Sequence, residues 1–353
     1  RHVRARNRDE RRQHERSQAV QMGLKVTVLE TMEDLRRWTE LARLAEDDPR
    51  MARERYVSYL AADERRRKKL EADFWTAAFF WPMPRGTRWA PTFDEFQRLR
   101  EQGPEALPAE RLLDVEALAE QYRFFHWHLE FPDVFGDEGG GFDVVLGNPP
   151  WERIKLQEKE FFAGRDAAIA NAGTAAQRRK LIARLPETNP SLHAAYAAAL
   201  RESESTSHFQ RDSGRFPLTA SGDINTYAVF AGLARQIIAS NGRAGLVVPT
   251  GIATDYTYRD FFASVVESGQ LASLNDFENR EGLFPGTHRS YKFSLLTLTG
   301  GGAAEAEFAF FVHTADELAD PERRFPLAGP DLALMNPNTR TVPVFRTRRD
   351  AEL

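Results

Sequence analysis

The stretch GFDVVLGNPPW, which runs from Gly141 to Trp151, decides the fold class of this chain. Its first half, Phe142 to Leu146, is apolar and β-branched, too short for a helix, and typical of a strand that is buried on both faces. Gly147 and the two prolines then end the strand abruptly, because proline fixes φ and donates no backbone N–H. We therefore expect a buried strand whose carboxyl end continues into a stiff, extended loop.

That loop has the composition of a binding site for a flat molecule that carries an amino group. In open α/β sheets, ligands bind at the carboxyl ends of the strands. The Asn148 side chain supplies a hydrogen-bond acceptor there, and Trp151 supplies an aromatic plate. The alternative is a Pro-Pro turn in which Trp151 is an ordinary core residue.

The loop and the residues before it resemble a known group of enzymes. Asn-Pro-Pro-Trp after such a strand resembles the (Asp/Asn)-Pro-Pro-(Tyr/Phe/Trp) signature of amino-group methyltransferases that use S-adenosylmethionine. The preceding RFFHWHLEFPDVF (Arg123 to Phe135) is similar to the lead-in of large adenine-specific DNA methyltransferases from restriction-modification and phage-defence systems, including type IIG-like, BREX and DISARM methylases. The resemblance implies an α/β fold, namely a partial Rossmann-like S-adenosylmethionine-dependent methyltransferase sheet with large helical insertions.

The resemblance also implies a reaction, which is transfer of a methyl group from S-adenosylmethionine to adenine N6 in double-stranded DNA. The Asn148 side-chain oxygen and the Pro149 carbonyl would accept the two amine hydrogens, with Pro150 keeping the turn rigid, so that the nitrogen lone pair becomes reactive. The adenine must be flipped out of the duplex, which costs a few kcal/mol. Stacking on Trp151, worth about 1–3 kcal/mol, would repay part of that cost.

Further site residues follow from the same resemblance. A Phe-Pro pair in the loop GLFPGTHRS contributes a second aromatic contact to the flipped base in the family, which makes Phe284 the candidate, although a core phenylalanine is the alternative. Asp223 and Tyr227 resemble the start of the helix that borders the cofactor pocket. The expected partners are double-stranded DNA and subunits of a restriction or defence system, and the expected location is the cytoplasm.

Two other functions remain open. Enzymes that methylate protein glutamine or RNA guanine amines share Asn-Pro-Pro-aromatic, but they are compact and lack large helical insertions. A catalytically silent DNA-binding or scaffold subunit could keep the fold, but would have no reason to keep Asn148, both prolines and the aromatic residue.

The Gly-rich loop that would hold the methionine part of the cofactor is missing from the pattern. The run Gly139 to Gly141 precedes a strand instead of following one, so it reads as a turn. We therefore expect the chain to be an internal fragment, with the cofactor loop before Arg1 and most of the DNA-reading part after Leu353. Alone, it is expected not to methylate.

Composition excludes several other classes. The 353 residues include no cysteine, which excludes disulfides and thiolate metal sites. The sequence contains no apolar stretch of about 18 residues, so no membrane span is predicted. The net charge of −4 is not that of a small DNA-binding protein. The basic runs Arg1 to Arg16 and Arg65 to Lys69 could contact phosphates, but solvated helix faces are the preferred interpretation. His126 and His128 lack further ligands, so no metal is predicted and a packed strand is expected there.

The sequence divides into a mostly helical insertion or linker region (residues 1–122), the C-terminal half of the methyltransferase catalytic domain (123–313) and the start of a following region (314–353). Strands are expected at Arg243–Gly251, Leu271–Asn279 and Ser290–Leu298. A helical insertion at residues 152–220, with helices at Gln157–Asn171 and Ala175–Leu185, is expected to border the DNA. Its candidate phosphate contacts are Lys155, Lys159, Arg178, Arg179 and Lys180.

Overall fold

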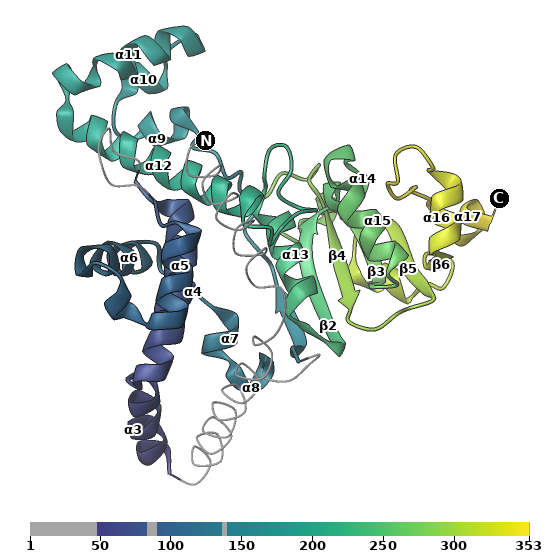
Figure 1. Cartoon of the computed structure of the whole chain (residues 1–353). Coiled ribbons are helices and arrows are strands. Elements are labelled where there is room, and N and C mark those ends of the chain that lie inside the picture. Colours follow the sequence, from purple (N-terminus) through teal and green to yellow (C-terminus); the bar gives the residue numbers. More distant parts are fainter. Residues whose placement is uncertain (1–47, 83–89, 136–139, 353) are drawn as a thin grey trace. The chain divides into compact units, whose positions relative to one another are not determined.

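The structure is a computed structural model that describes residues 48–82, 90–135 and 140–352. The chain forms two compact units, one that ends at Gly140 and one that begins at Gly141 (Figure 1). This boundary lies just before the Asn-Pro-Pro-Trp strand and not after residue 122, because residues 123–135 pack onto the helices of the first unit. The basic run Arg1 to Arg16 lies outside the described residues.

The described part of the first unit is helical. A capping box between Thr92 and Glu95 begins one of its helices, and the Asp48 carboxylate caps another. Phe74, Leu99 and Val115 come from three different helices and form a buried core. The helices are α3 (Pro49–Leu60), α4 (Asp63–Phe80), α5 (Phe93–Gln102), η1 (Pro104–Ala106), α6 (Ala109–Tyr122), α7 (Trp127–Glu130) and α8 (Pro132–Phe135).

The histidine pair in this unit is not on a strand, so that prediction was wrong. His126 directly precedes α7 and His128 lies within it. A helix of four residues is too short to show helical periodicity, which is why the alternation around Trp127 imitated a strand. His126 is buried, and its Nε2 lies 2.8 Å from Asp73 Oδ1 on α4. Among the described residues, no group of three or more His, Cys, Asp or Glu is placed to hold a metal ion.

The second unit contains a six-stranded mixed sheet with the order β1-β2-β4-β3-β5-β6. Strands β1 and β2 are parallel, as are β3 and β5, and β4 lies antiparallel between β2 and β3. This arrangement confirms the predicted α/β class and the three strands that the sequence placed after residue 242. The strands are β1 (Phe142–Gly147), β2 (Ile238–Pro249), β3 (Leu271–Glu278), β4 (Lys292–Thr299), β5 (Glu305–Val312) and β6 (Phe325–Ala328).

Helices cover one face of this sheet and extend the unit beyond it. The helices are α9 (Glu158–Ala163), α10 (Ala167–Ala170), α11 (Ala175–Thr188), α12 (Pro190–Asp212), α13 (Thr226–Ile237), α14 (Gly251–Thr254), η2 (Tyr256–Tyr258), α15 (Arg259–Glu267), η3 (Asn279–Glu281), η4 (Ala315–Ala319), α16 (Gly329–Met335) and α17 (Arg348–Glu352). No helix among the described residues has the length and apolar composition needed to span a membrane.

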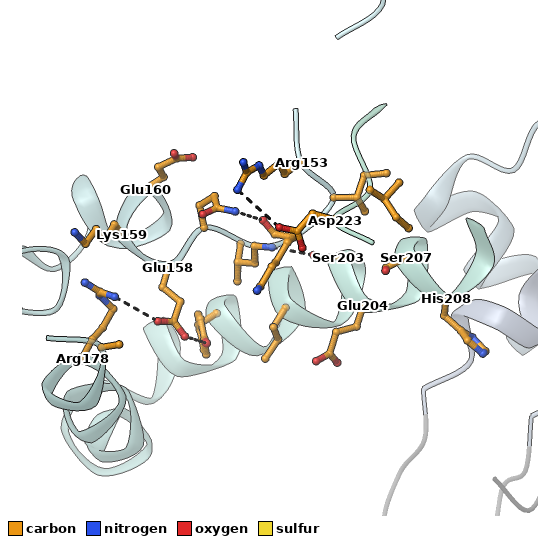
Figure 2. Close-up of a pocket in the computed structure, with 18 of the residues that line it drawn as sticks. Arg153, Glu158, Lys159, Glu160, Arg178, Ser203, Glu204, Ser207, His208 and Asp223 are labelled. Carbon is orange, nitrogen blue, oxygen red and sulfur yellow. Dashed lines mark hydrogen bonds and ion pairs between the residues drawn. The ribbon is translucent and has the colours of Figure 1, made fainter. Parts of the chain in front are cut away.

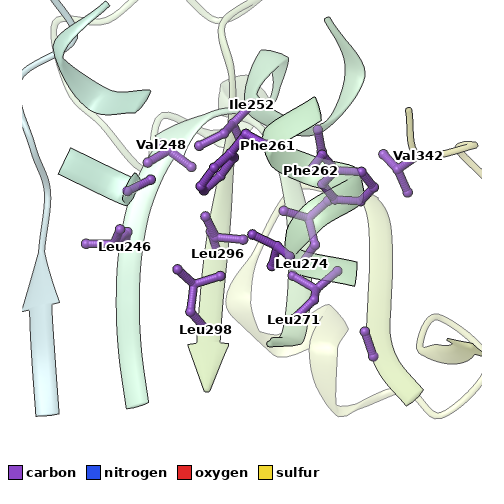
Figure 3. Packing of buried hydrophobic residues seen from close by; sticks show 14 of the residues in the cluster. Leu246, Val248, Ile252, Phe261, Phe262, Leu271, Leu274, Leu296, Leu298 and Val342 are labelled. Atoms are coloured by element: carbon purple, nitrogen blue, oxygen red, sulfur yellow. The ribbon is translucent and has the colours of Figure 1, made fainter. Parts of the chain in front are cut away.

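The main core of the second unit lies between the sheet and helices α13 and α15. Neighbouring strands contribute Leu246, Leu274 and Leu298 to it. Helix α15 contributes Phe261 and Phe262 to the same cluster, and Phe261 lies close to Ile252 (Figure 3). The alternation of buried and half-buried residues along β2 and β4 shows that the opposite face is less deeply covered.

Strand β1 lies at the edge of the sheet, so the expectation of a strand buried on both faces was wrong. Among the described strands it pairs with β2 alone. Val145 packs on the main core, whereas Val144 is 70% exposed and Leu146 is 84% exposed on the other face. A short apolar run predicts a strand, but it does not indicate whether neighbours cover it.

Residues after His313 continue the second unit instead of opening a new region. Strand β6 pairs antiparallel with β5, and Phe325 and Leu327 join the main core. Pro326 alternates with them and is exposed, as suits a proline on an edge strand. The region predicted to begin at residue 314 therefore starts with residues that extend the same sheet.

Candidate functional site

The Asn-Pro-Pro-Trp loop follows the carboxyl end of β1, as the sequence predicts. Asn148 is exposed, and its side chain makes no hydrogen bond within the described part of the chain. Pro149 is buried and Pro150 is exposed. The loop thus presents an amide acceptor that no other described group uses.

Trp151 ends the loop, and its side chain is partly buried. Its Nε1 donates a hydrogen bond of 3.2 Å to the carbonyl oxygen of Val247 on β2. The ring packs against both the main core and a second cluster that contains Phe277 and Phe293. Trp151 therefore has a fixed orientation, and the part of its ring outside the core is available for contact.

Thr226, at the start of α13, holds the loop from the other side. Its hydroxyl donates to the Pro150 carbonyl oxygen at 2.5 Å, and it also accepts from the Glu152 N–H at 3.0 Å. The Thr226 N–H donates to the Glu152 carbonyl oxygen at 2.9 Å. The sequence does not indicate this role, because nothing in a lone threonine points to a partner 76 positions away.

Phe284 reaches the same second cluster as Trp151. Its ring contacts Phe293 edge-on, with 4.8 Å between the ring centroids, and is partly buried. The structure thus brings the two aromatic residues that the sequence proposed for base contact to one cluster on the less covered face of the sheet. Their roles as base contacts stay predictions.

Asn279 fixes the loop that carries Phe284. The sequence does not indicate this role of Asn279 either. Its side chain is completely buried. The side-chain oxygen accepts from the Phe284 N–H at 2.9 Å, and its nitrogen donates to the carbonyl oxygens of Phe284 and Thr287 at 3.2 and 3.1 Å. Both N–H groups of the amide and one lone pair of its oxygen are engaged with this loop, so the backbone at Phe284 is firmly held.

The two residues that the resemblance linked to the cofactor lie in different environments. Asp223 is exposed and forms a 3.9 Å ion pair with Arg153. Tyr227 is 5% exposed, and its ring contacts Tyr258 edge-on. Burial, followed by the nearby Tyr258 hydroxyl, raises the pKa of Tyr227 far above its ordinary value. Tyr227 is therefore a neutral core residue.

A buried carboxyl group lies near the carboxyl ends of β2 and β3. Asp276 is 2% exposed and accepts hydrogen bonds from the hydroxyls of Thr250 and Ser294. Burial raises the pKa of this carboxyl, and the Thr250 hydrogen bond and the charge of Lys292 oppose that rise. The group fastens the segment after β2 to the centre of the sheet.

The helical insertion forms a cavity of about 930 Å³ (Figure 2). Four of the five basic residues that the sequence proposed as phosphate contacts line it, namely Lys155, Lys159, Arg178 and Arg179. Lys180 is exposed elsewhere on α11 and does not line the cavity.

Comparison with known proteins gives one family match. Residues 58–181 match the family model described as Eco57I restriction-modification methylase, which supports a methyltransferase of a restriction-modification system. This range contains the Asn-Pro-Pro-Trp loop. No curated protein matches the chain.

Two solved structures are similar to this chain. One is the type I restriction-modification system methyltransferase subunit from Streptococcus thermophilus, with 12% identity, a TM-score of 0.31, and coverage of 90% of this chain and 93% of that chain. The other is the ATP-dependent type ISP restriction-modification enzyme LlaBIII bound to DNA, with 9% identity, a TM-score of 0.26, and coverage of 60% of this chain and 12% of that chain.

Proposed function

We propose that this chain is part of an adenine-specific DNA methyltransferase of the type IIG, BREX or DISARM-like class, which transfers a methyl group from S-adenosylmethionine to adenine N6 in double-stranded DNA. The observation that carries the proposal is the exposed Asn148 amide, which has no hydrogen-bond partner among the described residues and lies between the end of β1 and the two prolines that stiffen the loop. The match of residues 58–181 to a restriction-modification methylase supports the same reaction class.

The residues of the loop would position and activate the amine. An exocyclic amine is a poor nucleophile, because its lone pair is delocalised into the ring. Hydrogen bonds from its two N–H groups to the Asn148 oxygen and the Pro149 carbonyl favour tetrahedral nitrogen, where the lone pair is free. Trp151 and Phe284 would hold the flipped base by stacking. This is positioning and electrostatic stabilisation, without a general base.

The described residues do not form a complete site for the methyl donor. Asp223 is already paired with Arg153, and the Tyr227 ring is in the core. Neither β1 nor β2 is followed by a Gly-rich loop that opens a long helix; the loops after them carry Asn-Pro-Pro-Trp and Pro-Thr-Gly. Donor binding therefore needs residues in addition to those described here.

The test is methylation of duplex DNA by the full-length protein, with the modified nucleoside identified by mass spectrometry. We expect N6-methyladenine from the wild type and a loss of about 100-fold or more for Asn148→Ala, with DNA affinity changed little. Asn148→Asp keeps an acceptor at this position and should retain more activity than alanine.

Three results would contradict the proposal in different ways. Normal methylation by Asn148→Ala would remove the assigned role of the amide. Methyl transfer to protein glutamine or RNA guanine instead of DNA would replace the substrate. DNA binding without any methyl transfer in the presence of the donor would indicate a silent subunit.

A further inference from the structure

We propose that the cavity of the helical insertion binds backbone phosphates of the DNA strand that carries the target base. This inference rests on the proposed function, which supplies DNA as the substrate. The cavity would be a second DNA-contacting region of the enzyme, in addition to the Asn-Pro-Pro-Trp loop.

The cavity has walls from three parts of the second unit. One wall is the segment from Arg153 to Glu160 with the adjacent Asp223 and Ile224, the second is the start of α11, and the third is α12 from Tyr196 to its end at Asp212. In Figure 2, Arg178 lies towards one end of the cavity and His208 towards the other, and the Arg153–Asp223 pair lies between them.

The cavity begins where the Asn-Pro-Pro-Trp loop ends. Arg153 lines it and lies two residues after Trp151. A β-bridge joins Arg153 to Asn225, and the Ile154 N–H donates to the Ile224 carbonyl oxygen at 2.9 Å. The next residue, Thr226, binds the Pro150 carbonyl. The same pair of hydrogen-bonded segments therefore supports the loop and part of the cavity lining, which lets one DNA strand contact both.

The cavity has more available positive than negative charge. Its lining contains the cations Arg153, Lys155, Lys159, Arg178, Arg179 and Arg211 and the carboxylates Glu158, Glu160, Glu204, Asp212 and Asp223. Two carboxylates already have cationic partners, in the pairs Arg153–Asp223 and Arg178–Glu158, and Asp212 contacts the His208 ring at 3.2 Å.

The cations that remain point to an anionic ligand. Lys155, Lys159 and Arg179 are exposed and form no ion pair within the described part of the chain. Arg211 bonds only to neutral oxygens, those of Ser207 and Gly222. Against these four cations stand Glu160 and Glu204, together with Asp212, which contacts His208. Because the cations come from three separate segments, they suit a run of phosphates better than one small anion.

Arg178 supplies an independent indication. The residue is 7% exposed, and its Nε has no hydrogen-bond partner among the described residues. A buried guanidinium N–H without an acceptor is costly unless a ligand or water satisfies it. Its one carboxylate partner, Glu158, is 3.8 Å away and also accepts from the Tyr196 hydroxyl at 3.2 Å. A phosphate oxygen is a suitable additional acceptor for this side chain.

The test compares two triple variants that remove the same charge from the full-length protein. The first is Lys155→Ala, Lys159→Ala and Arg179→Ala, within the cavity. The second is Lys180→Ala, Arg184→Ala and Arg201→Ala, on exposed positions of α11 and α12 that do not line it. Affinity for a duplex oligonucleotide is measured over a series of salt concentrations.

We expect the slope of log affinity against log salt to become shallower by about 2 to 3 in the cavity variant and by less than about 1 in the control, since each lost duplex phosphate contact removes about 0.9. Equal reductions would show a general charge effect and overturn the inference. Unchanged slopes with normal wild-type binding would overturn the cavity as a DNA contact while leaving the methyltransferase proposal intact. If the wild type binds no DNA, the proposed function itself fails. Circular dichroism melting shows whether each variant is folded.

Discussion

At the scale of single residues, Trp151 combines two tasks that substitution can separate. The hydrogen bond from its Nε1 to Val247 and its core contacts orient the ring. A phenylalanine would lose the hydrogen bond but keep an aromatic face, whereas alanine would lose both. Stacking on a flipped base requires only the face.

We therefore predict that Trp151→Phe weakens base capture less than Trp151→Ala, which should lose about 1–3 kcal/mol of stacking. The measurement is the fluorescence of 2-aminopurine placed at the target adenine, which rises when the base leaves the stack. Chemical denaturation of both variants separates loss of stability from loss of capture. If the two substitutions lowered the 2-aminopurine fluorescence equally, stacking on Trp151 would be contradicted.

Asn148 and Trp151 could be selected from sequence because their neighbours form a contiguous pattern of strand and prolines. Thr226 and Asn279 could not, because their roles depend on contacts made only in the folded unit. Thr226 meets a loop 76 residues earlier in the chain, and Asn279 is recognisable only through its burial against the Phe284 loop. The structural role of such polar residues can be predicted from sequence only when they lie within a local motif.

At the scale of elements, the edge position of β1 leads to a direct comparison of two leucines. Leu146 pairs with Gly245 and is 84% exposed, whereas Leu246 on the adjacent strand is 6% exposed on the opposite face. We predict that Leu146→Ala changes the free energy of unfolding by no more than about 0.5 kcal/mol. Leu246→Ala should cost about 2–5 kcal/mol. Urea denaturation of both variants measures the difference, and a large loss from Leu146→Ala would mean that another element covers β1.

Helices and strands could be predicted where the hydrophobic pattern of the sequence extends over enough residues to show its period. The helix expected at Ala175–Leu185 is α11, and the strands expected around residues 243–298 are β2, β3 and β4. A strand was predicted around His126 and His128, where the structure has α7, because a helix of one turn is too short to show a 3.6-residue periodicity. The position of β1 depends on what lies beside it in the sheet, and a local apolar run does not contain that information.

At the scale of the whole molecule, all the candidate site residues lie in the second unit, while the family match at residues 58–181 includes helices of both units. The stability of the second unit can be examined through its buried Asp276. Because burial raises the pKa of this carboxyl in the folded state, the folded protein binds the proton more tightly than the unfolded chain. Stability from this group is complete below the ordinary carboxyl pKa and declines as the pH rises towards the raised value.

Asp276→Asn should remove this decline, because the amide stays neutral and its oxygen can still accept from Thr250. We predict that the free energy of unfolding of the variant, relative to wild type, increases as the pH rises from about 3 to 7. Glu278 has a lowered pKa, chiefly through its hydrogen bond to Lys292, and acts in the opposite direction. It is present in both proteins, so its effect cancels in the difference. Urea denaturation at several pH values gives both curves. A difference that does not depend on pH would show that Asp276 titrates alike in the folded and unfolded states.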